Sequence, residues 1–210
     1  MTTILFAQQK GGAGKSTLLS QLAAHWMREG RRVAIVDIDP QRSAFAWART
    51  RARSGRLPAP AALPESADWR ASSDIRDAET ACDLVLVDTP GRSEALGLAL
   101  LERAGLVLIP CQPSMADVWA TEATLKAAEG RRVPHLVVLN RCPPRGRVAR
   151  LAEEELAQAG APLAQARVGA RSGFALAFML GAGVTELEPS AKAADEIRTL
   201  AAEILGRLGA

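Results

Sequence analysis

A glycine-rich stretch near the N-terminus constrains the fold of this chain more than any other feature. Residues 10–17 read Lys-Gly-Gly-Ala-Gly-Lys-Ser-Thr. The short apolar run Thr3–Ala7 before this stretch is typical of a buried strand, and the apolar spacing over Leu18–Met27 after it predicts a helix. A glycine-rich turn between a strand and a helix directs backbone N–H groups and the positive end of the helix at one point. We therefore expect an anion of phosphate size to bind at this turn.

The side chains of this turn suit a polyphosphate that carries magnesium. Lys15 can reach the terminal phosphates, and the Ser16 hydroxyl can ligate the metal ion. Thr17 can hydrogen-bond the phosphate nearer the nucleoside. The alternative is a glycine-rich turn without a ligand, but the strand and the helix that a phosphate-binding loop requires are both predicted at this place.

Short apolar runs alternate with helical patterns along the rest of the chain. The predicted strands are Thr3–Gln8, Arg32–Asp37, Asp83–Asp88, Leu106–Pro110, Pro134–Asn140 and Pro162–Arg167. The predicted helices are Lys15–Glu29, Ser43–Arg53, Asp68–Ala81, Ser93–Arg103, Met115–Glu129, Val148–Ala159 and Ser190–Leu208. Continuously apolar strands that alternate with helices indicate an α/β fold, with a mostly parallel, twisted sheet between helices on both faces. A ligand is then expected at the carboxyl ends of the strands.

Length and composition are those of one domain spanning residues 1–210. Hydrophobic residues make up 48% of the chain, which is enough for one extensive core. The proline-rich run 57–64 predicts an irregular connection, with an edge strand as the alternative. No apolar run reaches the roughly 18–20 residues that span a membrane, and the first residues enter a strand directly. The three cysteines are widely spaced and odd in number, so we expect a cytoplasmic protein with reduced thiols.

Carboxylates follow two predicted strands at the edge of the sheet where the glycine-rich turn lies. Asp37 and Asp39 come at the end of the second strand and just after it, and Asp88 ends the third. Pro40 ends the strand and stiffens the turn, and Gly91 can bring an N–H group toward a terminal phosphate. We expect Asp88 to hold magnesium through a coordinated water. An Asp-Pro turn without a ligand is the alternative for Asp37 and Asp39.

Asn140 is the candidate for reading the nucleotide base. The strand that ends at Asn140 resembles the guanine-reading strand of GTPases, whose motif is Asn-Lys-x-Asp. The residues that follow here are Arg141, Cys142 and Pro143, so the aspartate that binds the guanine amino group is lacking. This difference favours adenine, with Asn140 hydrogen-bonded to the base edge. A turn residue at a strand end, without contact to a base, is the alternative.

The lysine directly before the paired glycines makes the loop unusual. With Lys10 in front and Lys15 in the ordinary place, the chain resembles the ParA/MinD family of deviant Walker A ATPases. The resemblance implies an ATPase with ATP and Mg2+ as cofactors, a low intrinsic turnover and a homodimer in the ATP state. It also implies that Lys10 contacts the nucleotide of the partner subunit, that Asp39 positions the attacking water and that Asp37 supports the magnesium shell.

These inferences define three sets of site residues. The catalytic residues are Lys10, Lys15 and Asp39. The nucleotide-binding residues are Lys10, Gly11, Gly12, Ala13, Gly14, Lys15, Ser16, Thr17 and Asn140. The metal-binding residues are Ser16, Asp37 and Asp88.

Within the family, the chain resembles the small ParA proteins that lack an N-terminal helix-turn-helix. The resemblance covers nearly the whole chain and includes segments 39–47, 109–120, 183–186 and 193–197. A MinD-like membrane helix is not favoured, because the last predicted helix has a polar face of mixed charge. The glycine patterns that flank the cluster cysteines of nitrogenase iron protein are lacking. The substrate-binding additions of the ATP-dependent ligases hardly fit in 210 residues.

Nonspecific DNA is the expected partner of the ATP-bound dimer. The net charge of +3 is modest, but the positive residues are mostly arginine, which suits phosphate; a GC-rich genome gives the same composition. The resemblance puts Arg167 and Arg171 in the position of family arginines that contact DNA; ordinary solvated helix faces are the alternative for these and the other basic residues. Further candidates are Arg145, Arg147, Arg150, Lys192 and Arg198. The resemblance implies a nucleoid-associated protein that partitions a plasmid or chromosome through a ParB-like adaptor. Positioning of a protein cluster is the alternative, and a small-molecule ligase is a further one.

Overall fold

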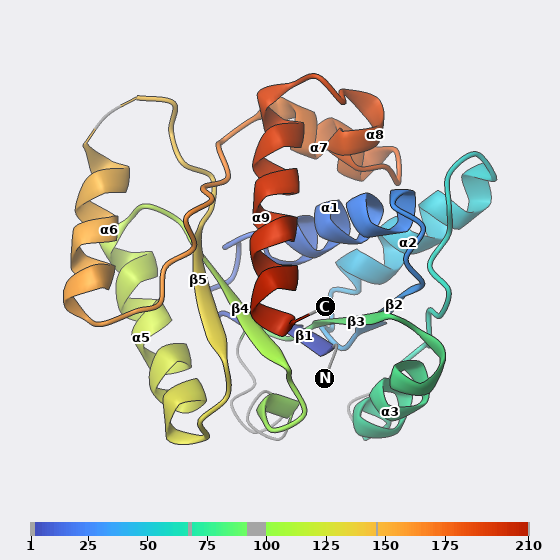
Figure 1. Ribbon diagram of the computed structural model, residues 1–210, viewed down its shortest axis with the longest axis horizontal. Helices are drawn as coiled ribbons and strands as arrows, with labels where there is room; N and C mark the ends of the chain where they lie inside the picture. The colour runs from blue at the N-terminus through green and yellow to red at the C-terminus, as the bar shows by residue number, and fades with distance from the viewer. Residues whose placement is uncertain (1–2, 67–68, 92–99, 146, 210) are drawn as a thin grey trace.

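A five-stranded parallel sheet lies at the centre of the computed structural model, which describes residues 3–66, 69–91, 100–145 and 147–209 (Figure 1). The strands are β1 (Thr3–Phe6), β2 (Val33–Asp37), β3 (Leu84–Asp88), β4 (Leu106–Cys111) and β5 (His135–Leu139). Their order across the sheet is β2-β3-β1-β4-β5, and all neighbours pair in parallel. The predicted parallel α/β fold is confirmed. Because β1 is central, the loop that follows it lies between the ends of β3 and β4.

Helices cover both faces of this sheet. One face carries α1 (Lys15–Arg28), α2 (Ser43–Ser54), α7 (Ser172–Met179), α8 (Val184–Leu187) and α9 (Lys192–Leu208). The other carries α3 (Ala71–Ala81), α5 (Met115–Gly130) and α6 (Val148–Gln158). Successive strand residues point to opposite faces, so Ile4 and Phe6 join the first core while Leu5 joins the second. Burial on both faces is the reason why the strands are apolar at nearly every position.

Helix α1 is the centre of the first core. Its Leu22 and Trp26 are fully buried, and it contacts α2, α7, α8 and α9. The apolar stripe of α9, which includes Ile197, Leu200 and Ile204, packs into the same core, so this face of the C-terminal helix is turned toward the body of the protein. Among the described residues, no helix combines the length and the apolar character that crossing a membrane requires.

The predicted strand Pro162–Arg167 is wrong. This segment runs beside β5 but makes only an isolated bridge, between Val137 and Leu163. The backbone N–H groups of Gln165 and Ala166 donate instead to the carboxylate of Glu203 on α9. The Glu203 side chain therefore accepts hydrogen bonds from N–H groups of this segment, and the regular backbone ladder of a strand does not form.

Two short helices were not predicted from the sequence, and two predictions fall partly outside the described residues. Helices α7 and α8 have 8 and 4 residues, and the apolar α7 lacks the alternation of polar and apolar positions that marks a helix. The predicted helix Ser93–Arg103 lies mostly within residues 92–99, outside the described part, although Leu100 and Leu101 are helical. The predicted start at Asp68 also lies outside it. The run 57–64 is a connection that meets β2 through one bridge, between Ala34 and Ala62.

A buried ion pair ties α2 to α8. The Arg51 side chain is fully buried, and its guanidinium binds both carboxylate oxygens of Glu186 at 2.6 and 2.8 Å. The same group donates to the carbonyl oxygens of Pro58 and Gly181. These hydrogen bonds satisfy the buried charge, which would otherwise be very costly inside the core.

We predict that Glu186→Ala lowers the free energy of unfolding by about 3–5 kcal/mol, because the charge of Arg51 then stays buried without its counter-ion. The matched control is Glu122→Ala, which breaks the exposed pair between Glu122 and Lys126 on α5 and should cost under ~1 kcal/mol. Urea unfolding of both variants measures the difference. Equal losses in the two variants would contradict this role for the pair.

Candidate functional site

The loop of residues 10–14 joins β1 to α1 at the carboxyl edge of the sheet. Gly12 and Gly14 have φ values of 84° and 93°, a conformation that glycine adopts readily and other residues rarely do. A Cβ atom at Gly14 would lie 2.5 Å from Nδ2 of Asn140, so a larger residue there would displace the Asn140 amide. Gly14 is also the N-cap residue of α1, directly before the first helical residue, Lys15. The loop thus leads directly into the first N–H groups of α1, which have no partner within the helix and can bind phosphate.

Ser16 and Asp88 meet beside this loop. Pairing of Phe6 with Asp88 across β1 and β3 places the carboxylate next to the loop, and Ser16 Oγ donates to Asp88 Oδ2 at 2.5 Å. Oδ1 of Asp88 is buried and has no hydrogen-bond partner among the described residues. Burial raises the pKa of Asp88 to about 7, against the opposing effect of the Ser16 hydrogen bond. A buried carboxylate oxygen that lacks a partner, beside a serine hydroxyl, fits a divalent cation.

Asp37 and Asp39 lie on the β2 side of the same edge. Asp37 pairs with Asp88 across β2 and β3, and its two oxygens accept the N–H groups of Asp39 and Phe45 at 3.0 and 2.8 Å. Burial raises the pKa of Asp37. Oδ1 of Asp39 accepts the Gln41 N–H at 2.9 Å. The observed contacts of Asp37 hold the turn and the start of α2, so its part in a magnesium shell stays a prediction.

The two lysines of the loop have different surroundings. Lys15 is buried, and its Nζ donates to the carbonyl oxygen of Gln8 at 3.5 Å. Lys10 has a side chain that is 39% exposed, and its Nζ lies 2.5 Å from Oδ2 of Asp117 in α5. Asp117 Oδ2 also accepts the Ser114 hydroxyl, and its Oδ1 is buried without a partner among the described residues. Lys10 is therefore held by its own chain rather than directed at the phosphate site.

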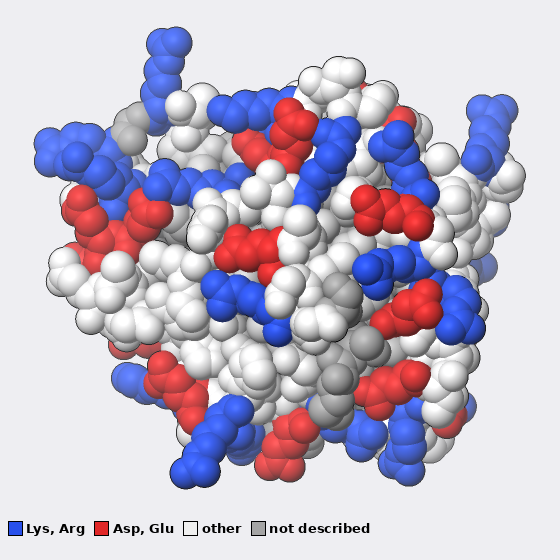
Figure 2. Space-filling view, viewed as in Figure 1, with Lys and Arg blue, Asp and Glu red and all other residues white. Residues whose placement is uncertain are grey.

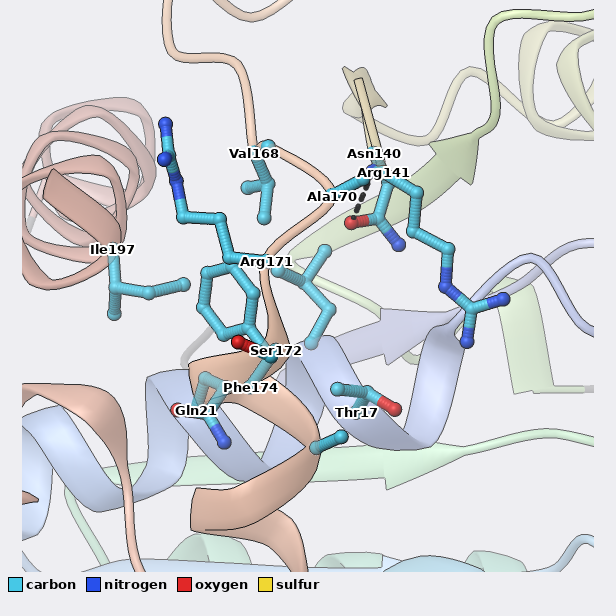
Figure 3. A pocket seen from close by; sticks show the side chains of 13 residues that line it. Thr17, Gln21, Asn140, Arg141, Val168, Ala170, Arg171, Ser172, Phe174 and Ile197 are labelled. Carbon is cyan, nitrogen blue, oxygen red and sulfur yellow. Dashed lines mark hydrogen bonds between the residues drawn. The ribbon is translucent and has the colours of Figure 1, made fainter. Parts of the chain in front are cut away.

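Asn140 touches the loop and one wall of a pocket. Its Nδ2 donates to the Ala13 carbonyl at 2.8 Å, and its Oδ1 accepts the Arg141 N–H. The pocket beside it has a volume of about 380 Å³ and includes Thr17, Gln21 and Phe174 in its lining. Figure 3 shows Asn140 and Arg141 on one side of this pocket, with Arg141 directed toward the start of α1. The pocket adjoins the loop where a nucleoside is expected, although part of the Asn140 amide is committed to the loop.

The two arginines predicted to bind DNA both lie in ion pairs. Arg171 binds both carboxylate oxygens of Glu196 on α9, at 2.6 and 3.0 Å, and this contact raises the pKa of its guanidinium. Arg167 pairs with Glu153 of α6. Figure 2 shows Lys and Arg side chains interleaved with Asp and Glu over the visible face. DNA phosphates would have to compete with these carboxylates, so binding by Arg167 and Arg171 stays a prediction.

Three side chains at this edge were not assigned a role from the sequence. Asp117 holds Lys10, while Gln112 Nε2 and Arg141 Nη1 both donate to the Gly12 carbonyl, at 2.8 and 3.1 Å. Gln112 follows β4 and Arg141 follows β5, so both lie at strand ends. That position is a signal in the sequence that could have marked Gln112 and Arg141.

We predict that Asp88 makes stability depend on pH in protein kept in a chelator. Its folded pKa of about 7 lies above the usual unfolded value of about 3.9, so the folded state binds the proton more tightly. The tighter proton binding adds to the free energy of unfolding. This added stability is fully present below the unfolded pKa and is lost as pH rises from about 4 through 7. Urea unfolding between these pH values should show the decline in wild type. The isosteric Asp88→Asn should lack this component, and parallel profiles for the two proteins would contradict the prediction.

Comparison with known proteins agrees with this geometry. The model of the CobQ/CobB/MinD/ParA nucleotide binding domain matches residues 4–184. The maintenance of carboxysome distribution protein A of Halothiobacillus neapolitanus is 29% identical over 210 residues, which cover 97% of this chain and 96% of that protein. The chromosome-partitioning ATPase Soj of Thermus thermophilus is 30% identical over 241 residues, with coverage of 98% and 96%.

Solved structures show the same fold. Apo McdA from Cyanothece has a TM-score of 0.80 at 17% identity and covers 98% of this chain and 99% of that chain. MinD with Mg-ADP from Pyrococcus horikoshii has a TM-score of 0.74 at 17% identity, with coverage of 96% and 95%. Because the matched segment 4–184 contains the glycine-rich loop and the aspartates at the strand ends, the chain belongs to the CobQ/CobB/MinD/ParA nucleotide-binding domain family and, with its relatives, to the ParA/MinD ATPases.

Proposed function

We propose that this chain is a ParA-type ATPase that dimerises on ATP, binds DNA nonspecifically as the dimer and positions a cargo through an adaptor that stimulates hydrolysis. The observation that carries the proposal is the pair of lysines on one loop. Lys15 is buried at its base, whereas Lys10 is partly exposed and held by Asp117. A lysine that its own phosphate site does not use is available to the nucleotide of a second subunit.

The loop and the nearby strand ends supply the parts of a nucleotide site. The first N–H groups of α1 and Lys15 bind the phosphates. Ser16 and Asp88 would hold magnesium, and the ion would neutralise phosphate charge. The described residues contain no group of three His, Cys, Asp or Glu able to hold a metal ion, so phosphate oxygens and water complete the shell. Asp39, beyond the end of β2, positions the attacking water.

Dimerisation requires Lys10 to exchange one anionic partner for another. In the single chain the partner is the carboxylate of Asp117. In the dimer it is the triphosphate bound to the other subunit, which carries more negative charge than one carboxylate. ATP therefore stabilises the dimer, because binding the nucleotide creates the contact that replaces the pair with Asp117.

DNA binding follows from dimerisation through effective concentration. When two weak basic surfaces are joined in one particle, the particle binds a DNA duplex far more tightly than either surface does alone. On each chain, Arg171 and Arg167 are partly neutralised by Glu196 and Glu153. A single chain is thus a weak DNA ligand, and the dimer gains affinity because both of its surfaces bind one duplex.

The cargo is a plasmid or chromosome in the favoured form of the proposal, with a ParB-like adaptor and association with the nucleoid. The relatives include a chromosome-partitioning ATPase and a protein for carboxysome distribution, so positioning of a protein assembly is the second candidate. A centromere-binding protein encoded beside this chain supports the first, and a shell or receptor protein supports the second. ATP turnover that requires a carboxylic acid, rather than DNA and an adaptor, would indicate a ligase instead.

We predict that the two loop lysines fail differently when each is changed to alanine. Lys15→Ala should weaken ATP binding by roughly 1.5–3 kcal/mol, because it removes a charge-assisted hydrogen bond within the site. Lys10→Ala should leave ATP binding by the monomer nearly intact and abolish the dimer. Titration with a labelled ATP analogue and sedimentation with magnesium and ATP separate the two effects.

A control variant addresses the pair that holds Lys10. Asp117→Asn removes the carboxylate charge but keeps Lys10, so it should form the dimer at a lower ATP concentration than wild type. The proposal of a contact between subunits is wrong if Lys10→Ala and Lys15→Ala weaken monomer binding equally. It is also wrong if Lys10→Ala still dimerises at saturating ATP.

We further predict that Glu196→Gln strengthens DNA binding in the presence of ATP, because it releases Arg171 from its counter-ion. The matched control is Glu122→Gln on α5, which makes the same change in net charge. Arg171→Ala should reduce the salt dependence of binding, by about 0.9 in the log–log slope for each phosphate that is no longer neutralised. Fluorescence anisotropy with a DNA duplex at several salt concentrations measures these effects. Equal gains for the two glutamate variants would indicate a general charge effect instead.

A further inference from the structure

The carbonyl groups of the phosphate-binding loop are held by side chains from neighbouring strands. Nε2 of Gln112 and Nη1 of Arg141 both donate to the Gly12 carbonyl, at 2.8 and 3.1 Å. Nδ2 of Asn140 donates to the Ala13 carbonyl at 2.8 Å. Gln112 follows β4, and Asn140 and Arg141 follow β5. All of these donors therefore come from the same side of β1.

The opposite side of β1 carries the candidate metal site. Asp88 ends β3, the other neighbour of β1, and Ser16 donates to it at 2.5 Å. A trans peptide plane points its carbonyl and its N–H group in opposite directions. Fixing the Gly12 and Ala13 carbonyls toward β4 and β5 thus turns the N–H groups of Ala13 and Gly14 away from those strands. This is the side on which phosphate would lie between the loop and Ser16.

We propose that Gln112, Asn140 and Arg141 form a loop brace, a set of positioning residues that aims the N–H groups of Ala13 and Gly14 at the phosphates. The proposal deepens the proposed function and rests on it in taking this loop as the phosphate site. It replaces base reading as the main role of Asn140. A glycine-rich loop is intrinsically mobile, so fixing its peptide planes in advance lowers the entropy lost when phosphate binds.

Two features of the backbone support a brace that is built into the site. Arg141 adopts a φ of 53°, a left-handed conformation that costs energy in a residue with a side chain. Its N–H donates to Oδ1 of Asn140 in this conformation, so both ends of the Asn140 amide are engaged. Gly14, with the Asn140 amide 2.5 Å from where its Cβ would be, packs directly against the brace. Asn140 is only 5% exposed, which protects its bond to Ala13 from water.

If Asn140 braces the loop, its loss should change the affinities for ATP, GTP and tripolyphosphate in a different way than if it reads the base. The affinities of ATP, GTP and inorganic tripolyphosphate are measured with magnesium, by competition against a labelled ATP analogue. If Asn140 braces the loop, Asn140→Ala weakens all three ligands by the same factor, about three- to tenfold for one hydrogen bond. If Asn140 reads the base, the same change weakens ATP, alters the preference over GTP and leaves tripolyphosphate unchanged, which would overturn the proposal.

The double variant Gln112→Met/Arg141→Met tests the other carbonyl. Gly12 then loses both donors, so all three ligands should weaken by more than the product of the two single effects. Gln112→Met/Arg141→Lys keeps a charged donor and should restore part of the affinity. The matched control is Gln158→Met/Arg76→Met, whose residues are exposed on α6 and α3 and should leave the affinities unchanged. Urea unfolding of every variant identifies losses that come from the fold alone.

The outcomes separate this inference from the proposed function. Wild-type protein that binds ATP, with brace variants that bind it equally well, overturns the brace and leaves the function in place. Wild-type protein that binds neither ATP nor tripolyphosphate overturns both. Uniform weakening without loss of stability, partly rescued by lysine at position 141, supports the brace.

Discussion

The burial of Asp88 is the constraint on which the rest of the site depends. A carboxylate at the end of β3 is held out of water with one oxygen bound to Ser16 and the other without a partner among the described residues, and its pKa is raised to about 7. Desolvation of that charge must be offset by a proton or by a cation. The parallel pairing of β1 with β3 fixes Asp88 beside the glycine-rich loop. The negative charge of Asp88 is thus stabilised when either a proton or a cation binds beside Ser16.

The glycine-rich loop lies between two sets of side chains, one acidic and the other made of hydrogen-bond donors. Acidic groups from β2 and β3 lie on one side, and amide and guanidinium donors from β4 and β5 lie on the other. Because β1 is the central strand, its loop lies where both sets can reach it. The donors hold carbonyl oxygens, and in the proposed function the loop N–H groups bind phosphate. The carboxylates of Asp37 and Asp88 are buried, and burial raises the pKa of both.

The arginines of this chain carry less unpaired positive charge than the composition suggests. Arg171, Arg167 and Arg51 each face a carboxylate of the same chain, and of these three pairs only the one with Arg51 is fully buried. The buried pair holds α2 against α8, whereas exposed pairs contribute little to stability and can exchange partners. The pair of Lys10 with Asp117 lies between these cases, since the Lys10 side chain is 39% exposed and the Asp117 side chain only 2%. The same chemistry thus holds two helices together in one place and leaves a lysine partly open to solvent in another.

The sequence by itself determined the parallel sheet, the loop and the aspartates at the strand ends, because strand periodicity, glycine conformation and strand–helix alternation are local properties. It failed for the segment 162–167, where Glu203 of α9 takes the N–H groups, and for the short helices α7 and α8. The partners of Lys10, Asn140 and Arg171 were decided only by the tertiary structure. Each of those contacts joins residues far apart in the chain, and a hydrogen bond or ion pair depends on distance in space, which no local pattern encodes.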